Sequence, residues 1–595
     1  MPPPLSLSRA AALGLRRPQL THAAARARPS QWAHHYSSGV PRRSSPVRYI
    51  ALLAITLGSA AGTVWAYQAY SPVQEPPGPP PIEHAEIVYE KPRKRAASKE
   101  ENRSLVSSQH VQVRQSWEHP GVYAWGSNAG RVVAPDSHEP VVRTPRRIPY
   151  FDGQILRDLK MDRDFAAAVT EKGDLVQWGA AFSRDVHGPT VTLKGKDIAK
   201  IAVSRDRIIA LTSGGCVYSL PVAAADQNLE EQPAPKSSWI PFWSSAPAPS
   251  SSCRSLKPEK LGWGERVIDV KSGQEHCLLL TSSGRVFSAA ASTEEFPSKG
   301  QLGIPGLTWR TRPAGPYDQP HEITSLSGAN IKAIAAGAFH SLALDKQGRV
   351  FAFGDNSTGQ LGMESARGTM PQLDTPTALP IPQLYTNTGY TPKVTSIAAG
   401  GLNSFFTVDA TPTTKPSPSQ PPLVADTWVS GSGIHGELGT GKWTHISAIP
   451  TKIKALSNLA EYSEKSRRMV PIRLAHLVVG STHACAVLDN ATHTTASRAG
   501  AAASDTNFGA DALWWGGNEY YQLGTGRRSN ASVPVHIGPL DGESAAGSGL
   551  PEEDRRLQIT PRCKVRIEEG GRGRQVSVEQ RVECGRFVTA VYSGA

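Results

Sequence analysis

The first 74 residues contain no aspartate or glutamate, although eight arginines are spread along them. An N-terminal stretch rich in Arg, Ala, Ser and Leu and free of acids is typical of a mitochondrial transit peptide, which we expect at residues 1–36. A disordered basic tail is the alternative interpretation. Because eight arginines against no acids give +8 of the formal net charge of +13, the rest of the chain is close to neutral and shows no basic footprint for nucleic acid.

Charge is also missing from residues 49–67, YIALLAITLGSAAGTVWAY, which follow Arg42, Arg43 and Arg48. At about 1.5 Å per residue this length matches the hydrocarbon core, so we expect one transmembrane helix in the mitochondrial inner membrane. Because the segment is rich in Gly and Ala, a second cleaved sorting signal is the alternative. The preceding arginines favour an N-terminus in the matrix and a C-terminal part in the intermembrane space, with the matrix as the alternative. Residues 68–117 are expected to form a Pro-rich, charged linker.

Signatures of catalysis are missing as well. The sequence has no strand–Gly-x-x-x-x-Gly-Lys-Ser/Thr–helix element, no Gly-x-Ser-x-Gly elbow and no His-Cys-carboxylate cluster with the spacing of metal ligands. We therefore expect no enzyme activity, no cofactor and no metal. The six cysteines include no Cys-x-x-Cys, and the sequence leaves open whether Cys563 and Cys584 pair.

The sequence does contain an internal repeat. Residues 337–362, GAFHSLALDKQGRVFAFGDNSTGQLG, recur in part at 272–303, 399–441 and 479–526, and weaker copies lie at 160–179 and 202–220. Each copy has an apolar stretch, an alternating strand, a tight turn with glycine, and a third strand that ends in an aromatic residue and glycine. Such a unit cannot bury its apolar face alone, so the copies are expected to stack radially as a propeller.

The two chain ends carry complementary halves of the repeat. Residues 122–130 supply only the outer half of a copy, and residues 582–591 supply only the inner half. We expect these halves to form one blade together and, with the six other copies, a seven-bladed all-β propeller over residues 118–595. Insertions into this propeller are expected at 222–260, 410–425, 490–511 and 541–556.

The repeat resembles that of the regulator of chromosome condensation family, seven-bladed propellers whose units carry a Gly-x-x-His box and a Trp-Gly-x-Asn-x-x-Gly-Gln-Leu-Gly box. The pattern is broken where Phe165, Arg207 and Asn403 replace the histidine. We interpret the glycines and histidines of the boxes as structural, because equivalent positions of different blades do not converge on a metal. The matching positions are Gly273, His276, Gly337, His340, Gly354, Gly359, Gly362, Gly480, His483, Gly516 and Gly524.

Within this family, the order of leader, uncharged segment and propeller resembles a fungal mitochondrial inner-membrane member required for assembly of respiratory complex III, the cytochrome bc1 complex. The resemblance implies a membrane-anchored scaffold whose partners are complex III subunits or assembly factors. Guanine-nucleotide exchange on a GTPase and association with the mitochondrial ribosome or RNA are the alternatives, although the near-neutral propeller disfavours direct nucleic-acid binding.

Three aromatic residues in the first insertion, Trp239, Phe242 and Trp243, are candidate partner contacts. Exposed aromatic side chains commonly anchor protein interfaces. Packing of the same side chains onto the propeller is the alternative.

Overall fold

The structure, a computed structural model, describes residues 108–227, 253–292, 297–306, 319–364, 371–414, 421–463, 466–495, 505–540, 556–569 and 572–595. The expected transit peptide (1–36), the uncharged segment (49–67) and the candidate contacts Trp239, Phe242 and Trp243 lie outside these residues. Within the described ranges, no helix has both the length and the apolar character needed to cross a membrane. The expected fold, a propeller preceded by a transmembrane helix, is corrected to an all-β propeller whose described helices are short.

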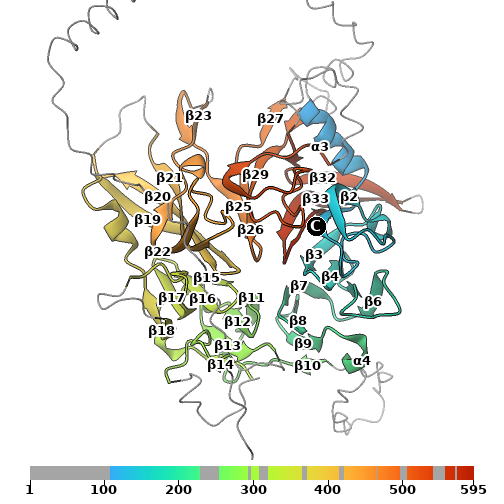
Figure 1. Cartoon of the computed structure of the whole chain (residues 1–595), viewed down its shortest axis with the longest axis horizontal. Helices are drawn as coiled ribbons and strands as arrows, with labels where there is room; N and C mark the ends of the chain where they lie inside the picture. The colour runs from blue at the N-terminus through green and yellow to red at the C-terminus, as the bar shows by residue number, and fades with distance from the viewer. Residues whose placement is uncertain are drawn as a thin grey trace, which may run out of the picture. The chain divides into compact units, whose positions relative to one another are not determined.

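Five separate antiparallel sheets surround a central channel (Figure 1). In each, the first strand lines the channel and the later strands lie progressively further out. The strands of the five sheets are β7 (Ile198–Val203), β8 (Arg207–Thr212), β9 (Val217–Pro221) and β10 (Arg254–Ser255); β11 (Val267–Ser272), β12 (His276–Thr281), β13 (Val286–Ala290) and β14 (His321–Glu322); β15 (Ile331–Ala336), β16 (His340–Asp345), β17 (Val350–Asp355) and β18 (Gln372–Ala378); β19 (Tyr390–Gly400), β20 (Asn403–Pro412), β21 (Val424–Gly433) and β22 (Thr444–Lys452); and β25 (Leu474–Val479), β26 (His483–Leu488), β29 (Ala510–Gly516), β30 (Ala531–Val535) and β31 (Gln558–Ile559).

A nine-stranded sheet completes the ring and contains both ends of the propeller. Strand β1 pairs with β34 in the register from Val122 opposite Tyr592 to Gly126 opposite Val588. The predicted pairing of residues 122–130 with residues 582–591 is therefore confirmed. The strands of this sheet are β1 (Val122–Ser127), β2 (Val141–Arg147), β3 (Leu156–Met161), β4 (Ala166–Thr170), β5 (Leu175–Trp178), β6 (Thr190–Leu193), β32 (Cys563–Glu569), β33 (Arg572–Cys584) and β34 (Val588–Gly594).

The expectation of seven separate blades is wrong. A parallel bridge between Leu156 and Gly594 joins β34 to β3, and the backbone N–H of Ala595 donates to the carbonyl of Leu156 at 3.0 Å. The last residues of the chain therefore connect two groups of strands. The strands β1, β2 and β32–β34 at the chain ends and the strands β3–β6 form one continuous sheet. The arrangement is five separate sheets and one sheet of nine strands.

Short elements decorate the ring. Helix α3 (Ser108–Glu118) begins inside the range expected to be linker, and it buries Val113 while Gln112 Nε2 donates to the carbonyl of Arg556 at 3.0 Å. The hairpins β23–β24 and β27–β28 extend from the connections between strands. The remaining elements are α4 (Ala224–Gln227), η1 (Pro149–Phe151), η2 (Thr324–Leu326), η3 (Ile381–Tyr385), η4 (Lys454–Leu456), β23 (Ala460–Ser463), β24 (Arg468–Pro471), β27 (Thr492–Thr495) and β28 (Asp505–Phe508).

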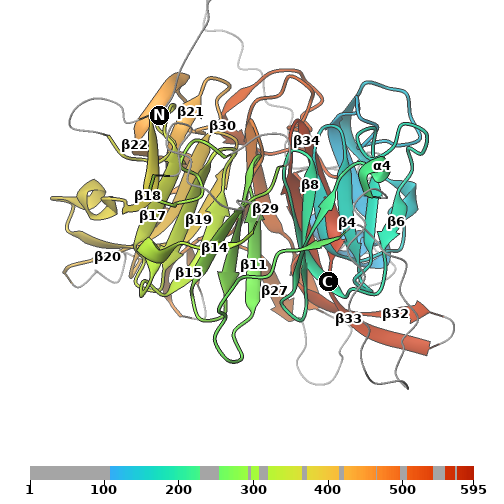
Figure 2. The same ribbon diagram turned by 90° about the horizontal axis from the view of Figure 1, so that it is seen from below.

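Strand direction gives the ring two distinct faces. The chain enters each innermost strand at one face, which we call the entry face, and turns into the second strand at the opposite face, which we call the turn face. Because the strands alternate in direction, the loops between third and fourth strands also lie on the turn face. The hairpins β27–β28 and β32–β33 extend from the entry face, at the lower side of Figure 2, and α4 lies on the turn face.

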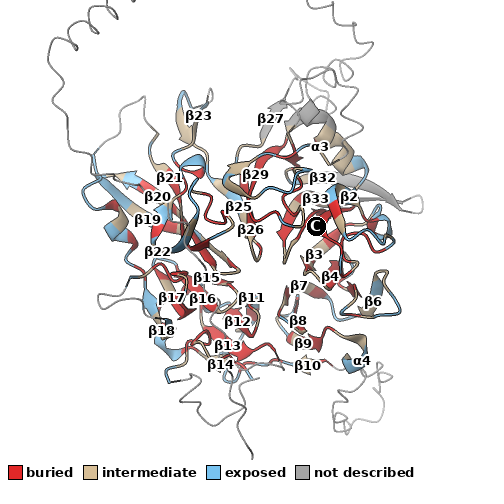
Figure 3. Ribbon diagram, viewed as in Figure 1, coloured by how far each residue is buried: buried red, intermediate tan, exposed pale blue. Residues whose placement is uncertain are grey.

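The core lies between neighbouring sheets. The second strands β8, β12, β16 and β26 are buried at every position, whereas the outer strand β22 exposes much of its length (Figure 3). Tryptophans fill the outer part of the core, and Trp125, Trp178, Trp514 and Trp515 are all fully buried. Aromatic side chains of this size remove large apolar areas from water, which stabilises the stacking of sheets.

Candidate functional site

The Gly-x-x-His box forms the turn between the first and second strands. In the box of Gly337 and His340, the glycine N–H donates to the histidine carbonyl at 2.9 Å. A Cβ on Gly337 would overlap Cε1 of the His340 ring and lie 2.5 Å from its Nδ1, and a Cβ on Gly273 would lie 2.5 Å from Cε1 of His276. The box therefore pairs glycine with histidine because the imidazole folds back over the glycine Cα.

Each of these histidines binds a hydroxyl group of the next sheet. The Nε2 atom of His276 lies 2.8 Å from Ser341 Oγ, that of His340 lies 2.9 Å from Ser404 Oγ, and that of His483 lies 2.8 Å from Thr589 Oγ1. All three imidazoles are buried. We call these three contacts the latches, because each one connects two neighbouring sheets.

The hydroxyl groups indicate which ring nitrogen carries the proton. Ser341 Oγ donates to the carbonyl of Gln301 at 2.9 Å, and Thr589 Oγ1 donates to the carbonyl of Gln522 at 2.6 Å. A hydroxyl has one hydrogen, so it accepts from the histidine Nε2–H, and Nδ1 is unprotonated. Nδ1 of His276 and of His483 has no hydrogen-bond partner among the described residues, which is consistent with that assignment.

Burial keeps the three imidazoles neutral. It lowers the pKa of His276 to about 3, with a further contribution from nearby His340, and it lowers the pKa of His340 to about 4 and that of His483 to about 3. The three rings belong to different sheets. The described part of the chain holds no group of three His, Cys, Asp or Glu side chains suited to a metal ion. The arrangement holds sheets together and offers no acid or base to a substrate.

The remaining positions of the same turn have no histidine. Phe165, Arg207, Asn403 and Val588 occupy them, and Arg207 Nε instead donates to Ser219 Oγ of its own sheet at 2.6 Å. In each latch, the hydroxyl belongs to the residue that directly follows the box position of the next sheet. At the four junctions without a box histidine, the residues at this position are Ile208, Cys277, Ala484 and Ala166. Hydroxyl groups therefore occur at this position only where a histidine faces them.

The second box provides another contact between sheets. Trp125 Nε1 donates to the carbonyl of Gln522 at 2.9 Å, and Trp515 Nε1 donates to the carbonyl of Glu437 at 2.7 Å. Gly524 has a φ of +73°, and a Cβ there would lie 2.8 Å from Trp125 Nε1. The last glycine of the box therefore gives the tryptophan of the next sheet room to donate. Gly354 and Gly516 also have positive φ, and a Cβ on either one would meet the backbone of the neighbouring strand.

The central channel has a volume of about 650 Å³ and is lined by the innermost strands. Charged residues lie on the side formed by β3, β7, β11 and β33, and mainly small and apolar residues lie on the side formed by β15, β19 and β25. The acids of the wall form ion pairs: Glu583 with Lys160 at 2.6 Å, Asp269 with Lys200 at 3.1 Å, Asp162 with Arg586 at 2.7 Å and Asp158 with Lys160 at 3.9 Å. Carboxylates engaged in this way are poor candidates for general bases.

The sequence left open whether Cys563 and Cys584 form a disulfide, and the strand register answers this question. Cys563 pairs in register with Val578, and Cys584 pairs with Thr589, so the two cysteines are not opposite each other. Both thiols are free in the structure.

Exposed apolar side chains gather at the outer edge of two neighbouring sheets on the turn-face side. The loop before β22 contacts β30, since the N–H of Gly441 donates to the carbonyl of Ser532 at 2.7 Å. Exposed side chains on this loop, on β22 and on β30 form the rim patch, which consists of Ile434, Trp443, Ile446, Ile449 and Val533. Sequence reasoning missed this patch. The sequence does hold a signal for the patch, in the residue that precedes a proline in the outer strand. This residue is polar in two sheets (Thr144 and Thr375) and apolar in two others (Ile449 and Val533).

The repeat itself is shared with known proteins. Residues 331–360 and 347–406 match models of the regulator of chromosome condensation (RCC1) repeat. These matches show that the chain contains RCC1 repeats, so the predicted resemblance is confirmed, and the repeats stand in a ring of antiparallel sheets.

Two mitochondrial proteins are similar to the chain in sequence. The chain is 28% identical over 364 residues to Protein FMP25, mitochondrial, from Saccharomyces cerevisiae, a match that covers 57% of each chain. It is 23% identical over 375 residues to the RCC1 domain-containing protein RUG3, mitochondrial, from Arabidopsis thaliana, covering 61% of this chain and 71% of that protein. The match thus spans little more than half the length of the yeast relative. These relatives support a mitochondrial location.

Solved structures share the fold. The crystal structure of human WBSCR16 covers 80% of this chain and 99% of its own, with a TM-score of 0.50 and 16% sequence identity. At that level of identity the likeness concerns the fold alone.

Proposed function

We propose that this protein is a mitochondrial scaffold that acts through protein–protein contacts, at the inner membrane, in the assembly of respiratory complex III. The acid-free leader and the two mitochondrial relatives support the compartment. The uncharged residues 49–67 support attachment to the membrane, and the resemblance of the whole architecture to a fungal mitochondrial member supports the role in complex III.

The observation that carries a binding role is a closed ring with an exposed apolar surface. The box histidines are latched and the acids of the channel wall are paired, so both sets of side chains already serve the fold. The rim patch, in contrast, holds five large apolar side chains that are each about half exposed. Contiguous exposed apolar side chains on a rigid scaffold commonly mark a protein-binding surface. In this proposal a complex III subunit or assembly factor docks on the rim patch.

The test is affinity purification of the tagged full-length chain from detergent-solubilised mitochondria. Complex III subunits or their assembly factors in the eluate are the expected result. A GTPase or ribosomal proteins in their place would contradict the proposal and favour the exchange-factor or ribosome-associated alternative. Carbonate extraction tests membrane attachment, because a protein found wholly in the soluble fraction is not held by the bilayer.

A surface variant locates the contact. Ile446→Glu combined with Ile449→Glu should accumulate like the wild type, because both side chains are about half exposed, yet it should fail to retain complex III components. The matched control is Val186→Glu, which changes an equally exposed valine in the loop between β5 and β6. Normal complex III levels in cells that carry only the rim variant would exclude the rim patch as the docking surface.

A further inference from the structure

Trp263 is the most exposed large apolar side chain of the described residues. It lies between Gly262 and Gly264 in the loop from β10 to β11, which reaches the innermost strand at the entry face. This loop is outside the repeat pattern, and it is on the opposite face from the rim patch. A fully exposed tryptophan keeps a large apolar area in contact with water, which is unfavourable. Its exposure therefore calls for a functional explanation.

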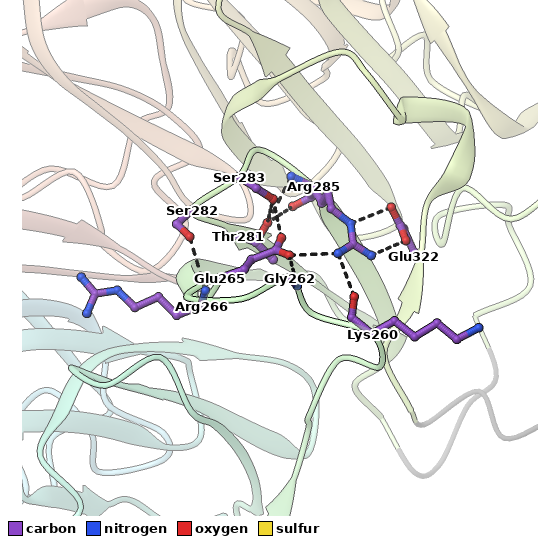
Figure 4. A network of polar contacts seen from close by, with 9 residues as sticks. All are labelled: Lys260, Gly262, Glu265, Arg266, Thr281, Ser282, Ser283, Arg285 and Glu322. Atoms are coloured by element: carbon purple, nitrogen blue, oxygen red, sulfur yellow. Dashed lines mark hydrogen bonds and ion pairs between the residues drawn. The ribbon is translucent and has the colours of Figure 1, made fainter.

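The loop that carries Trp263 is held in place by a polar network (Figure 4). The Glu265 carboxylate accepts hydrogen bonds from the N–H of Gly262 at 2.7 Å, from Arg285 Nη1 at 3.0 Å and from Ser283 Oγ. Arg285 also donates to the carbonyl of Lys260 at 3.1 Å, so both ends of the loop are fixed to the same guanidinium group.

The network extends into the sheet. Arg285 binds both carboxylate oxygens of Glu322, with a distance of 2.9 Å from Nε to Oε1, and the N–H of Ser282 donates to the carbonyl of Arg266 at 2.9 Å. The loop is thereby attached to the β12–β13 hairpin and to β14. Trp263 is therefore presented on a pre-ordered loop, which reduces the entropy lost when the side chain is immobilised by binding.

The loop that carries Trp263 is rich in basic side chains. Lys257, Lys260 and Arg266 of the same loop are exposed, together with Glu259, and Glu265 is balanced by Arg285. Ile268, an apolar residue near the start of β11, is also exposed. Adjacent connections on the entry face add further exposed lysines, namely Lys194, Lys196 and Lys346.

We propose that the Trp263 loop, with its basic neighbours, docks the entry face onto a lipid surface that carries anionic headgroups. Trp263 is fully exposed and flanked by two glycines, so it lacks the surrounding side chains that exclude water at a protein hot spot. The lipid interface instead accepts a single indole at headgroup depth. Lysines and arginines beside it are attracted to anionic lipid, and their stems can lie along the apolar boundary. The inference does not depend on the role in complex III.

Vesicle binding of the purified full-length chain gives the first test. With vesicles of phosphatidylcholine and about 20% phosphatidylserine, Trp263→Ala and the charge reversal Lys257→Glu with Lys260→Glu should each weaken co-sedimentation roughly tenfold. The matched control is Trp443→Ala, which removes an exposed tryptophan of the rim patch and should bind like the wild type. If Trp443→Ala and Trp263→Ala reduce binding equally, or if adding phosphatidylserine does not increase the binding of the wild type above its binding to pure phosphatidylcholine, the proposal is wrong.

A cross-linking experiment keeps the test valid if another part of the chain also binds the vesicles. A photoactivatable phosphatidylserine in the same vesicles should label the tryptic peptide Leu261–Arg266, which contains Trp263. The comparison peptide is Trp443–Lys452, which contains the rim-patch tryptophan of the other face. Labelling of the first peptide about tenfold above the second is the expected result. Equal labelling of the two peptides would overturn the proposal, whatever the complex III experiments show.

Discussion

The junctions between neighbouring sheets are of two kinds, latched and unlatched. At the latched junctions, a buried histidine of one sheet binds a hydroxyl of the next, as His340 binds Ser404. At the unlatched junctions, both the histidine and the hydroxyl are replaced, as they are at Asn403 and Ala484. A buried donor without an acceptor is costly, so the two residues are present or absent together. The comparison shows that the residue at one position of a repeat depends on the neighbouring repeat. A box histidine occurs only where the next sheet provides a hydroxyl.

The largest expected effect concerns the glycine under a latch. Gly337→Ala should lower the free energy of unfolding by roughly 3–5 kcal/mol, because the new Cβ would overlap the His340 imidazole in a buried turn. The control is Gly188→Ala, where no atom lies within 4 Å of the added Cβ and the change should stay within about 0.5 kcal/mol. Denaturant titration measures both. Equal stability of the two variants would show that the imidazole moves aside easily.

The second prediction compares the two kinds of junction directly. His340→Ala should cost roughly 2–3 kcal/mol, because it opens a cavity and leaves the buried Ser404 hydroxyl without its partner. Asn403→Ala should cost less than about 1 kcal/mol, since the Asn403 Oδ1 atom has no hydrogen-bond partner among the described residues. Thermal unfolding of both variants checks the order, and a larger loss for Asn403→Ala would contradict the comparison.

The third prediction uses pH. The folded-state pKa of His340 is lowered to about 4, below its value of about 6.5 in the unfolded chain, so the unfolded state takes up the proton first. Stability is full above pH 6.5 and is lost as pH falls toward 4, by roughly 1–2 kcal/mol at pH 5 for this group. His340→Asn places the residue of an unlatched junction at this position and removes the titrating group. Between pH 7 and pH 5, its free energy of unfolding should therefore fall by roughly 1–2 kcal/mol less than that of the wild type. Parallel pH profiles for the two proteins would show that His340 is not buried as a neutral ring.

Much of this organisation was predictable from the sequence, because it is local and repeated. The Gly-x-x-His boxes, the tight turns and the complementary halves at 122–130 and 582–591 all indicate strands and ring closure. The continuous nine-stranded sheet was not predictable, since it depends on one parallel bridge between Leu156 and Gly594. The hydroxyl residues Ser341, Ser404 and Thr589 can be found in the sequence, because each one follows a box position. Their contact with a histidine could not be predicted without knowing which sheets are neighbours.

The exposed sites were harder to predict for a different reason. Trp263 lies in a loop outside the repeat, and that loop is ordered by the ion pairs of Arg285 with Glu265 and Glu322. The rim patch depends on which side of β22 faces water. The exposure of Trp263 leaves no periodic signal in the sequence, and the rim patch leaves only the residue before the proline of each outer strand, whereas buried strands leave a clear pattern.

A double-mutant cycle between His340 and Ser404 tests the latch most directly. The single variants are His340→Ala and Ser404→Ala, and the free energy of unfolding is measured for each one, for the double variant and for the wild type. The latch predicts a coupling energy of about 1 kcal/mol or more, because the second substitution removes a group that has already lost its partner. A coupling below about 0.3 kcal/mol between His340 and Ser404 would contradict the claim that buried histidines latch neighbouring sheets.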